Sequence, residues 1–80
     1  MQVHGYDKGF REEDEPTPHS LGEVTLPVSD ASELRRIAEF LQFAADELAT
    51  MGDNFDHLHL RDWDDQWSEA DTDLIVARVP

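Results

Sequence analysis

Two histidines, His57 and His59, stand two residues apart in the stretch D-N-F-D-H-L-H-L-R-D-W-D-D-Q-W. Imidazole is a frequent zinc ligand and a frequent acid–base group, so metal binding and catalysis are the first hypotheses to weigh. On a strand both rings would point to the same face, and His4, His19 or Asp62 could complete a set of ligands. Every H-x-H strand has this geometry, however. We therefore interpret the pair as surface or interface histidines and expect no metal site.

The sequence contains none of the motifs that hydrolases or phosphate-binding enzymes use. No serine lies in a G-x-S-x-G turn, and neither a glycine-rich phosphate loop nor an H-E-x-x-H pair is present. The acids that follow Asp62 imitate a calcium loop, but Trp67 takes the place of the required glycine and Asp73 that of the bidentate glutamate. Paired carboxylates need a pocket to become catalytic, and a small domain offers little concavity. We expect a protein that is not an enzyme and uses no cofactor.

The charge balance is the most pronounced feature of the composition. Nineteen acidic residues against six basic ones give a formal net charge of −13 over 80 residues. Such a field repels phosphate backbones and anionic membranes, so nucleic acid and membrane surfaces are not expected partners. It attracts cationic proteins and accelerates their capture. The absence of cysteine fits a reducing compartment, and without an apolar leader or spanning segment we expect a cytoplasmic location.

One long helix is predicted between residues 31 and 51. Asp30 can accept a hydrogen bond from the Glu33 amide, and Gly52 can end the helix in the left-handed conformation. Apolar residues follow at helical spacing and form one stripe: Leu34, Ile37, Ala38, Leu41, Ala44, Ala45 and Leu48. Phe40 flanks that stripe and should pack, whereas Phe43 lies far from its centre and should be exposed.

The remaining sequence predicts four strands around this helix. They fall at residues 1–6, 21–28, 55–61 and 73–79, each with alternating or continuous apolar residues. Residues 8–19 are acidic, contain two prolines and read as a flexible loop. The result is a single α+β domain over residues 1–80, in the order β-β-α-β-β. We expect a four-stranded, mainly antiparallel sheet with the helix on one face and a strand order of 1-2-4-3, so that the last strand is central.

The face of this sheet away from the helix is the expected interaction surface. The strand at 55–61 would present its histidines and its arginine there, with two tryptophans close behind in the sequence. Tryptophan contributes strongly to interface energy, although one of the two indoles is expected to close the end of the core. The candidate partner-binding residues are His57, His59, Arg61, Asp62, Trp63, Trp67 and Phe43.

Several segments together resemble a family of small bacterial proteins classed as immunity protein 32. They are E-V-T-L at 23–26, S-E-L at 32–34, F-L at 40–41, A-D-E-L at 45–48, G-D-N-F-D-H-L-H-L-R-D at 52–62 and D-L-I-V at 73–76. The block with two histidines is the most specific of these. The resemblance implies a bacterial protein that binds and neutralises a toxin domain of a polymorphic toxin, and it implies no catalytic residue. A cationic nuclease toxin would suit the acidic charge.

Two other functions remain open at this level. A homodimeric structural or regulatory protein would bury the uncovered sheet face or Phe43 against a second copy, which would offset a thin core. A histidine-dependent metal protein would gain thermal stability on binding zinc.

Overall fold

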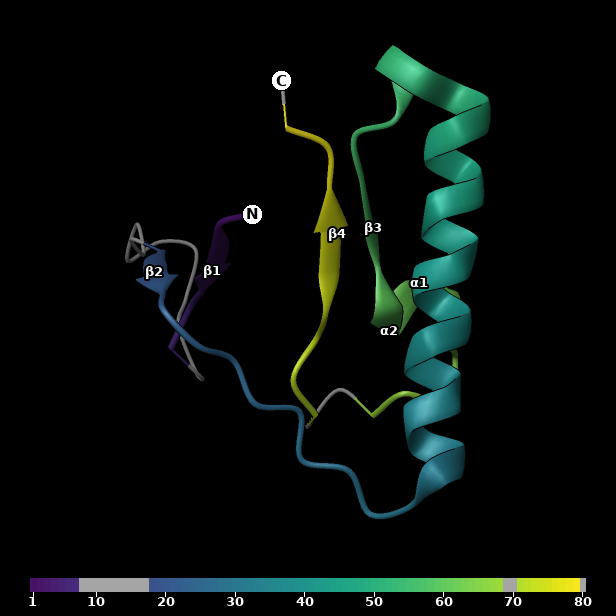
Figure 1. Ribbon diagram of the computed structural model, residues 1–80. Helices are drawn as coiled ribbons and strands as arrows, with labels where there is room; N and C mark the ends of the chain where they lie inside the picture. Colours follow the sequence, from purple (N-terminus) through teal and green to yellow (C-terminus); the bar gives the residue numbers. More distant parts are fainter. Residues whose placement is uncertain (8–17, 69–70, 80) are drawn as a thin grey trace.

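The computed structural model describes residues 1–7, 18–68 and 71–79. They form an α+β protein, as the sequence predicts (Figure 1). The elements along the chain are β1 (Val3–Gly5), β2 (His19–Leu21), α1 (Ala31–Met51), the short 3₁₀ turn η2 (Gly52–Asn54), β3 (His57–His59), α2 (Leu60–Trp63) and β4 (Ile75–Ala77). Most of the expected loop at residues 8–19 lies outside the described residues, but His19 belongs to β2.

The boundaries of α1 agree with the prediction, and local hydrogen bonds explain them. Oδ1 of Asp30 accepts a hydrogen bond from the Glu33 amide at 3.0 Å, which satisfies one of the amides exposed at the helix start. The Glu33 carboxylate accepts from the amide of Ser29 at 3.0 Å, one residue earlier than in a standard capping box. At the other end, Gly52 has φ 54° and its amide donates to the Leu48 carbonyl.

The strands form two antiparallel pairs, not the single four-stranded sheet expected from the sequence. β1 pairs with β2, and β3 pairs with β4, so the predicted order 1-2-4-3 does not occur. In the second pair His57 lies opposite Ala77 and His59 opposite Ile75. The last strand was expected to be central, but among the described strands only β3 is bonded to it. Ile75 is accordingly 48% exposed.

The second predicted strand is the main error in the sequence interpretation. Residues 24–28 have no strand structure, and their apolar side chains are exposed: Val24 by 60%, Leu26 by 48% and Val28 by 37%. Pro27 has no amide proton to donate to a neighbouring strand. No described strand pairs with this segment, so its alternating apolar side chains are not buried by a sheet. The segment instead connects β2 to α1 along the outside of the molecule (Figure 1).

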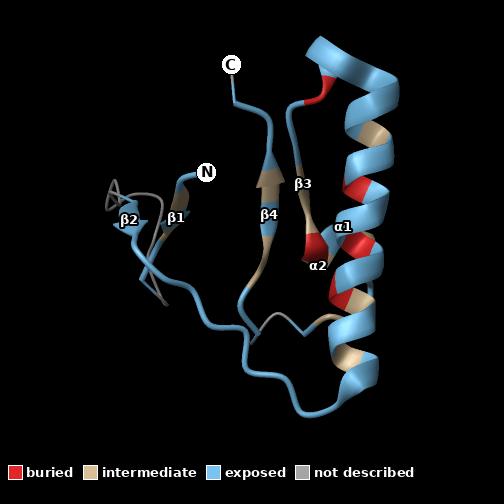
Figure 2. Ribbon diagram, viewed as in Figure 1, coloured by how far each residue is buried: buried red, intermediate tan, exposed pale blue. Residues whose placement is uncertain are grey.

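The core lies between α1 and the layer formed by β3, α2 and β4 (Figure 2). Its buried members are Ile37, Phe40, Ala44, Phe55 and Leu60, and it is flanked by partly buried Leu58, Trp63, Trp67, Leu74 and Val76. Phe40 is fully buried, which confirms that it packs. The third strand also ends earlier than expected, because Leu60 and Arg61 already belong to α2.

Only part of the predicted apolar stripe of α1 faces this core. Ile37 and Ala44 are buried, whereas Leu34, Leu41 and Leu48 are 48%, 45% and 38% exposed. At about 100° per residue, the buried face is centred roughly a quarter turn away from the leucines. Phe40, the bulkiest buried side chain of α1, draws that face toward β3 and α2. The helix therefore has more apolar surface than its single sheet covers.

Candidate functional site

The two histidines of β3 lie on the sheet face that points away from α1. Leu58, between them, packs against the core cluster, so strand alternation turns His57 and His59 to the opposite side. Their side chains are 47% and 33% exposed. The two rings meet edge to face with centroids 5.0 Å apart. The expectation that this face of the sheet carries both imidazoles therefore agrees with the structure.

Each imidazole is held by a carboxylate. Nδ1 of His57 lies 2.5 Å from Oδ2 of Asp56, and Nδ1 of His59 lies 2.5 Å from Oδ2 of Asp73. An ionised carboxylate can only accept hydrogen bonds, so Nδ1 of each ring is the donor. The Nε2 atom is then the nitrogen left to meet a partner, as an acceptor in the neutral ring or a second donor in the protonated one.

Asp73 is the better anchored of the two carboxylates. Its other oxygen, Oδ1, accepts a hydrogen bond from the Arg61 amide at 3.0 Å, so it also fixes the start of α2. Burial is the largest single influence on this group and raises the pKa of the Asp73 carboxyl. The hydrogen bonds from His59 and the Arg61 amide, helped by the charges of both side chains, outweigh burial and bring that pKa below its ordinary value. The aspartate is thus firmly ionised at neutral pH.

The arrangement of His57 and His59 suits contact with a partner better than binding of a metal ion. A carboxylate behind an imidazole is the arrangement that commonly supports a metal ligand, and His57 and His59 both have it. Within the described ranges, however, no group of three or more histidine, cysteine or acidic side chains converges on a point where an ion could be held. Two imidazoles alone do not make a closed zinc site.

The aromatic candidates gather elsewhere, at the junction of α1 and α2. The Trp63 ring lies 5.7 Å from that of Phe40 and 6.2 Å from that of Phe43, both in tilted contacts. Trp63 is half-buried and flanks the core, while Phe43 is 37% exposed, as its position on the helix predicts. These side chains stand on the helix side of the sheet. They do not share a surface with the imidazoles.

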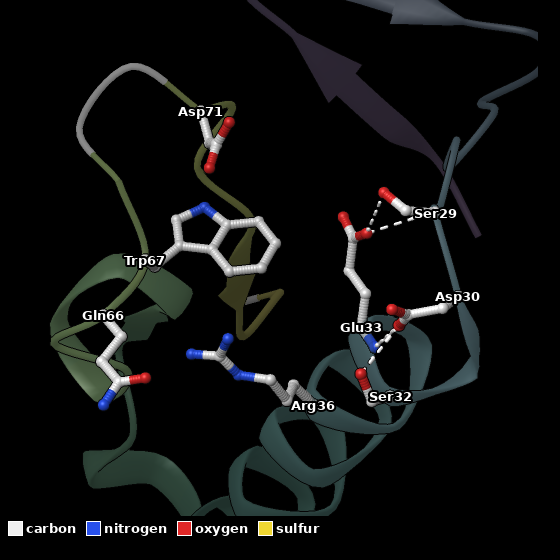
Figure 3. Close-up of a pocket in the computed structure, with 8 residues that line it drawn as sticks. All are labelled: Ser29, Asp30, Ser32, Glu33, Arg36, Gln66, Trp67 and Asp71. Carbon is white, nitrogen blue, oxygen red and sulfur yellow. Dashed lines mark hydrogen bonds between the residues drawn. The ribbon is translucent and has the colours of Figure 1, made fainter.

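Trp67 lies in a third place, beside a shallow hollow near the start of α1 (Figure 3). Nε1 of Trp67 donates to the Thr72 carbonyl at 3.0 Å, and the indole packs beside the core. The hollow has a volume of about 280 Å³ and is lined by Ser29, Asp30, Ser32, Glu33, Arg36, Gln66, Trp67 and Asp71. Much of its polar lining is already engaged in capping α1, and Arg36 is paired with Asp64. It is therefore part of the scaffold.

The structure thus divides the predicted site residues among four locations. His57 and His59 lie on the β3–β4 sheet. Arg61 belongs to α2 instead of the strand; its amide donates to Asp73 and its guanidinium to the Asp71 carbonyl at 3.1 Å. Asp62 is exposed in α2. Trp63 and Phe43 form the aromatic junction, and Trp67 borders the hollow.

Sequence reasoning missed the carboxylates that orient the rings. Asp56 is adjacent to His57 in the chain, so its pairing could have been proposed from neighbourhood alone. Asp73 is 14 residues from His59, and only the pairing of β3 with β4 brings the two together. No local sequence pattern predicts a contact between residues this far apart in the chain.

Comparison with known proteins gives one match. The protein-family model described as "Immunity protein 32" matches residues 29–79, a range that contains α1, β3, α2, β4 and the imidazole pair. No curated protein and no solved structure matches. In the described residues, none of the helices has the length and apolar character that crossing a bilayer requires.

Proposed function

Because the chain belongs to the immunity protein 32 family, we propose that it protects a bacterial cell by binding a toxin domain and blocking it. The protection is stoichiometric and involves no reaction catalysed by this protein. The toxin is bound through the outer face of the β3–β4 sheet. We call this surface the imidazole face and define it by His57, His59, Ile75 and Ala77, together with the exposed Asp56, whose carboxylate is bonded to His57.

Charge supports a basic partner for this face. Residues 52–73 contain seven aspartates and one glutamate against a single arginine. The side chain of Asp56 is 92% exposed, so its charge reaches solvent, whereas the 95% exposed side chain of Asp53 is paired with Arg78 at 2.8 Å. Like charges crowded on a small domain lower its own stability, and a cationic partner relieves that repulsion while it is steered into contact. A nuclease domain, whose active site is built to receive phosphates, is the partner class that best fits.

The fixed orientation of the imidazole rings also supports a role in binding a partner. Each ring is fixed through Nδ1, so binding at Nε2 costs little additional side-chain entropy. Ile75 supplies apolar area opposite His59 on the neighbouring strand, with 48% of its surface exposed. A face with an apolar centre, oriented polar groups and a charged rim has the anatomy of a protein–protein interface.

The proposal predicts that a neighbouring gene encodes the toxin, and the test uses such a candidate toxin domain, purified in an inactive form. Titration calorimetry with the intact protein should give a one-to-one complex. The double variant His57→Ala/His59→Ala should lose at least about tenfold in affinity, the effect of roughly 1.4 kcal/mol. His4→Ala, which removes an exposed histidine in β1 outside the matched range, is the control and should bind normally. Equal binding by the double variant and the control would exclude the imidazole face.

A further inference from the structure

The helix α1 carries an exposed apolar row that its own core does not use. We call it the Leu/Ala seam. It consists of Ala31, Leu34, Ala38, Leu41, Ala45 and Leu48, all of them exposed in the structure. Figure 2 shows the corresponding contrast: buried positions of α1 lie toward β3, and most of the remaining helix positions are exposed. Unlike isolated apolar residues, which are common on protein surfaces, these six form a continuous line.

The spacing within the seam is that of a two-helix interface. The three alanines are seven residues apart, and so are the three leucines, with alternating steps of three and four between them. A repeat of this kind keeps one seam facing a partner helix over its whole length. It extends through all three heptads of the 21-residue helix. Ile37, Phe40 and Ala44, which build the protein's own core, fall outside the six positions.

We infer that the seam binds the seam of a second copy, with the two helices antiparallel. In that arrangement Leu34 lies against Ala45 of the second copy, Leu41 against its Ala38, and Leu48 against its Ala31. Every layer then pairs one large side chain with one small one, which lets two helices approach closely and interlock. The two-fold axis passes between residues 39 and 40. The surface is thus complementary to itself, as an isologous dimer requires.

The distribution of charge on α1 favours a second copy over the basic partner proposed above. The acids of the helix are Glu33, Glu39, Asp46 and Glu47, and none occupies the seam or the positions beside it. Those flanking positions hold Arg35, Gln42 and Ala49 on one side and Ile37, Ala44 and Met51 on the other. Two copies can therefore meet here without bringing carboxylates together, and a cationic domain would find no charge to bind.

The rest of the molecule still repels its copy, since each chain has a net charge of −13. Added salt screens that repulsion and leaves the apolar seam intact, so dimer formation should strengthen with salt. Toxin binding through the imidazole face should weaken under the same change. The two associations use different faces, and the dimer does not depend on the proposed function.

Sedimentation of the intact protein across roughly 1 to 100 µM, at low and high salt, tests this inference. We expect the dimer fraction to rise with both concentration and salt. Leu41→Lys, next to the two-fold axis, should be monomeric throughout. The matched control is Leu26→Lys, because Leu26 is 48% exposed and Leu41 45% exposed. A wild-type protein that stays monomeric at the highest concentration and salt would overturn the inference, and so would a Leu41→Lys variant that dimerises like the control. Circular dichroism of each variant verifies that the helix is retained.

Cysteine cross-linking tests the antiparallel orientation, since the chain has no cysteine of its own. The variant Leu34→Cys/Ala45→Cys should form a disulfide-linked dimer under mild oxidation, because the two positions face one another across the seam. Leu34→Cys alone should not, because the two sulfurs would be about 16 Å apart along the helices, from 1.5 Å per residue. Efficient cross-linking by the single variant would instead establish parallel helices and contradict the arrangement.

Discussion

Nδ1 of His59 lies 2.5 Å from Oδ2 of Asp73, and the same distance joins Nδ1 of His57 to Oδ2 of Asp56, the residue just before β3. The two pairs differ in their surroundings. The Asp73 side chain is 16% exposed and also receives the Arg61 amide, whereas the Asp56 side chain is 92% exposed. The two hydrogen bonds have the same length, but the one shielded from solvent should contribute more to the stability of the fold. Asp73 links β3, α2 and the start of β4, while Asp56 orients a ring.

The first prediction compares these two aspartates. Asp73→Ala leaves the Nδ1 donor of His59 and the Arg61 amide without their acceptor, and it should lower the free energy of unfolding by about 1–3 kcal/mol. Asp56→Ala should change it by less than about 0.5 kcal/mol, since solvent replaces the lost contact. Urea unfolding followed by the fluorescence of the two tryptophans measures both. A similar loss in the two variants would contradict the structural role assigned to Asp73.

The second prediction concerns pH. The pKa of Asp73 is lower in the folded protein than its ordinary value of 3.8, so the ionised carboxylate favours folding. Its contribution is complete above 3.8 and is lost as the pH falls through the folded-state pKa. The difference in unfolding free energy between wild type and Asp73→Ala should be fully present at about pH 5 and shrink as the pH falls below 3.8.

Using the difference between two proteins is necessary here, because acid also relieves the general repulsion among carboxylates and acts in the opposite direction. That effect is nearly common to both chains. A difference that grew as the pH fell below 3.8 would mean that Asp73 is ionised more readily in the unfolded chain, against the hydrogen bonds described.

The third prediction separates the two phenylalanines of α1. Phe40 is fully buried and Phe43 is 37% exposed, although both contact the Trp63 ring. Phe40→Ala should cost about 3–5 kcal/mol, which approaches the whole stability of so small a domain. Phe43→Ala should cost about 1 kcal/mol or less. Thermal unfolding monitored by circular dichroism distinguishes them, and a folded, cooperative Phe40→Ala variant would show that the core lies elsewhere.

The helix could be predicted because residues next to its two ends determine where it starts and stops. Asp30, Glu33 and Gly52 define the start and end of α1 through contacts of only a few residues. The α+β class followed from that helix and from the alternation around His57 and His59. What could not be predicted was the half of the apolar stripe that meets the sheet. Periodicity identifies an apolar surface but not the element that packs against it. The contact of Phe40 with Trp63 determines which side of α1 faces the sheet.

The sheet was harder to predict because strand pairing is a long-range property. Val24, Leu26 and Val28 alternate like strand residues, yet no described strand pairs with them and Pro27 lacks a donor. In the same way, the candidate residues near positions 57–67 are close in sequence but separate in space. The turn into α2 at Leu60 places the imidazoles and the Trp63 ring on opposite sides of the sheet.

The central claim is that an acidic surface around His57 and His59 captures a basic toxin domain. The most direct test is the affinity of the intact protein for a purified candidate toxin domain, measured by calorimetry at several salt concentrations. We predict a one-to-one complex that weakens steadily as salt rises, and that loses at least about tenfold in affinity in His57→Ala/His59→Ala. The claim would be contradicted if the toxin domain did not bind at low salt, or if binding were unaffected by salt and by removal of both imidazoles.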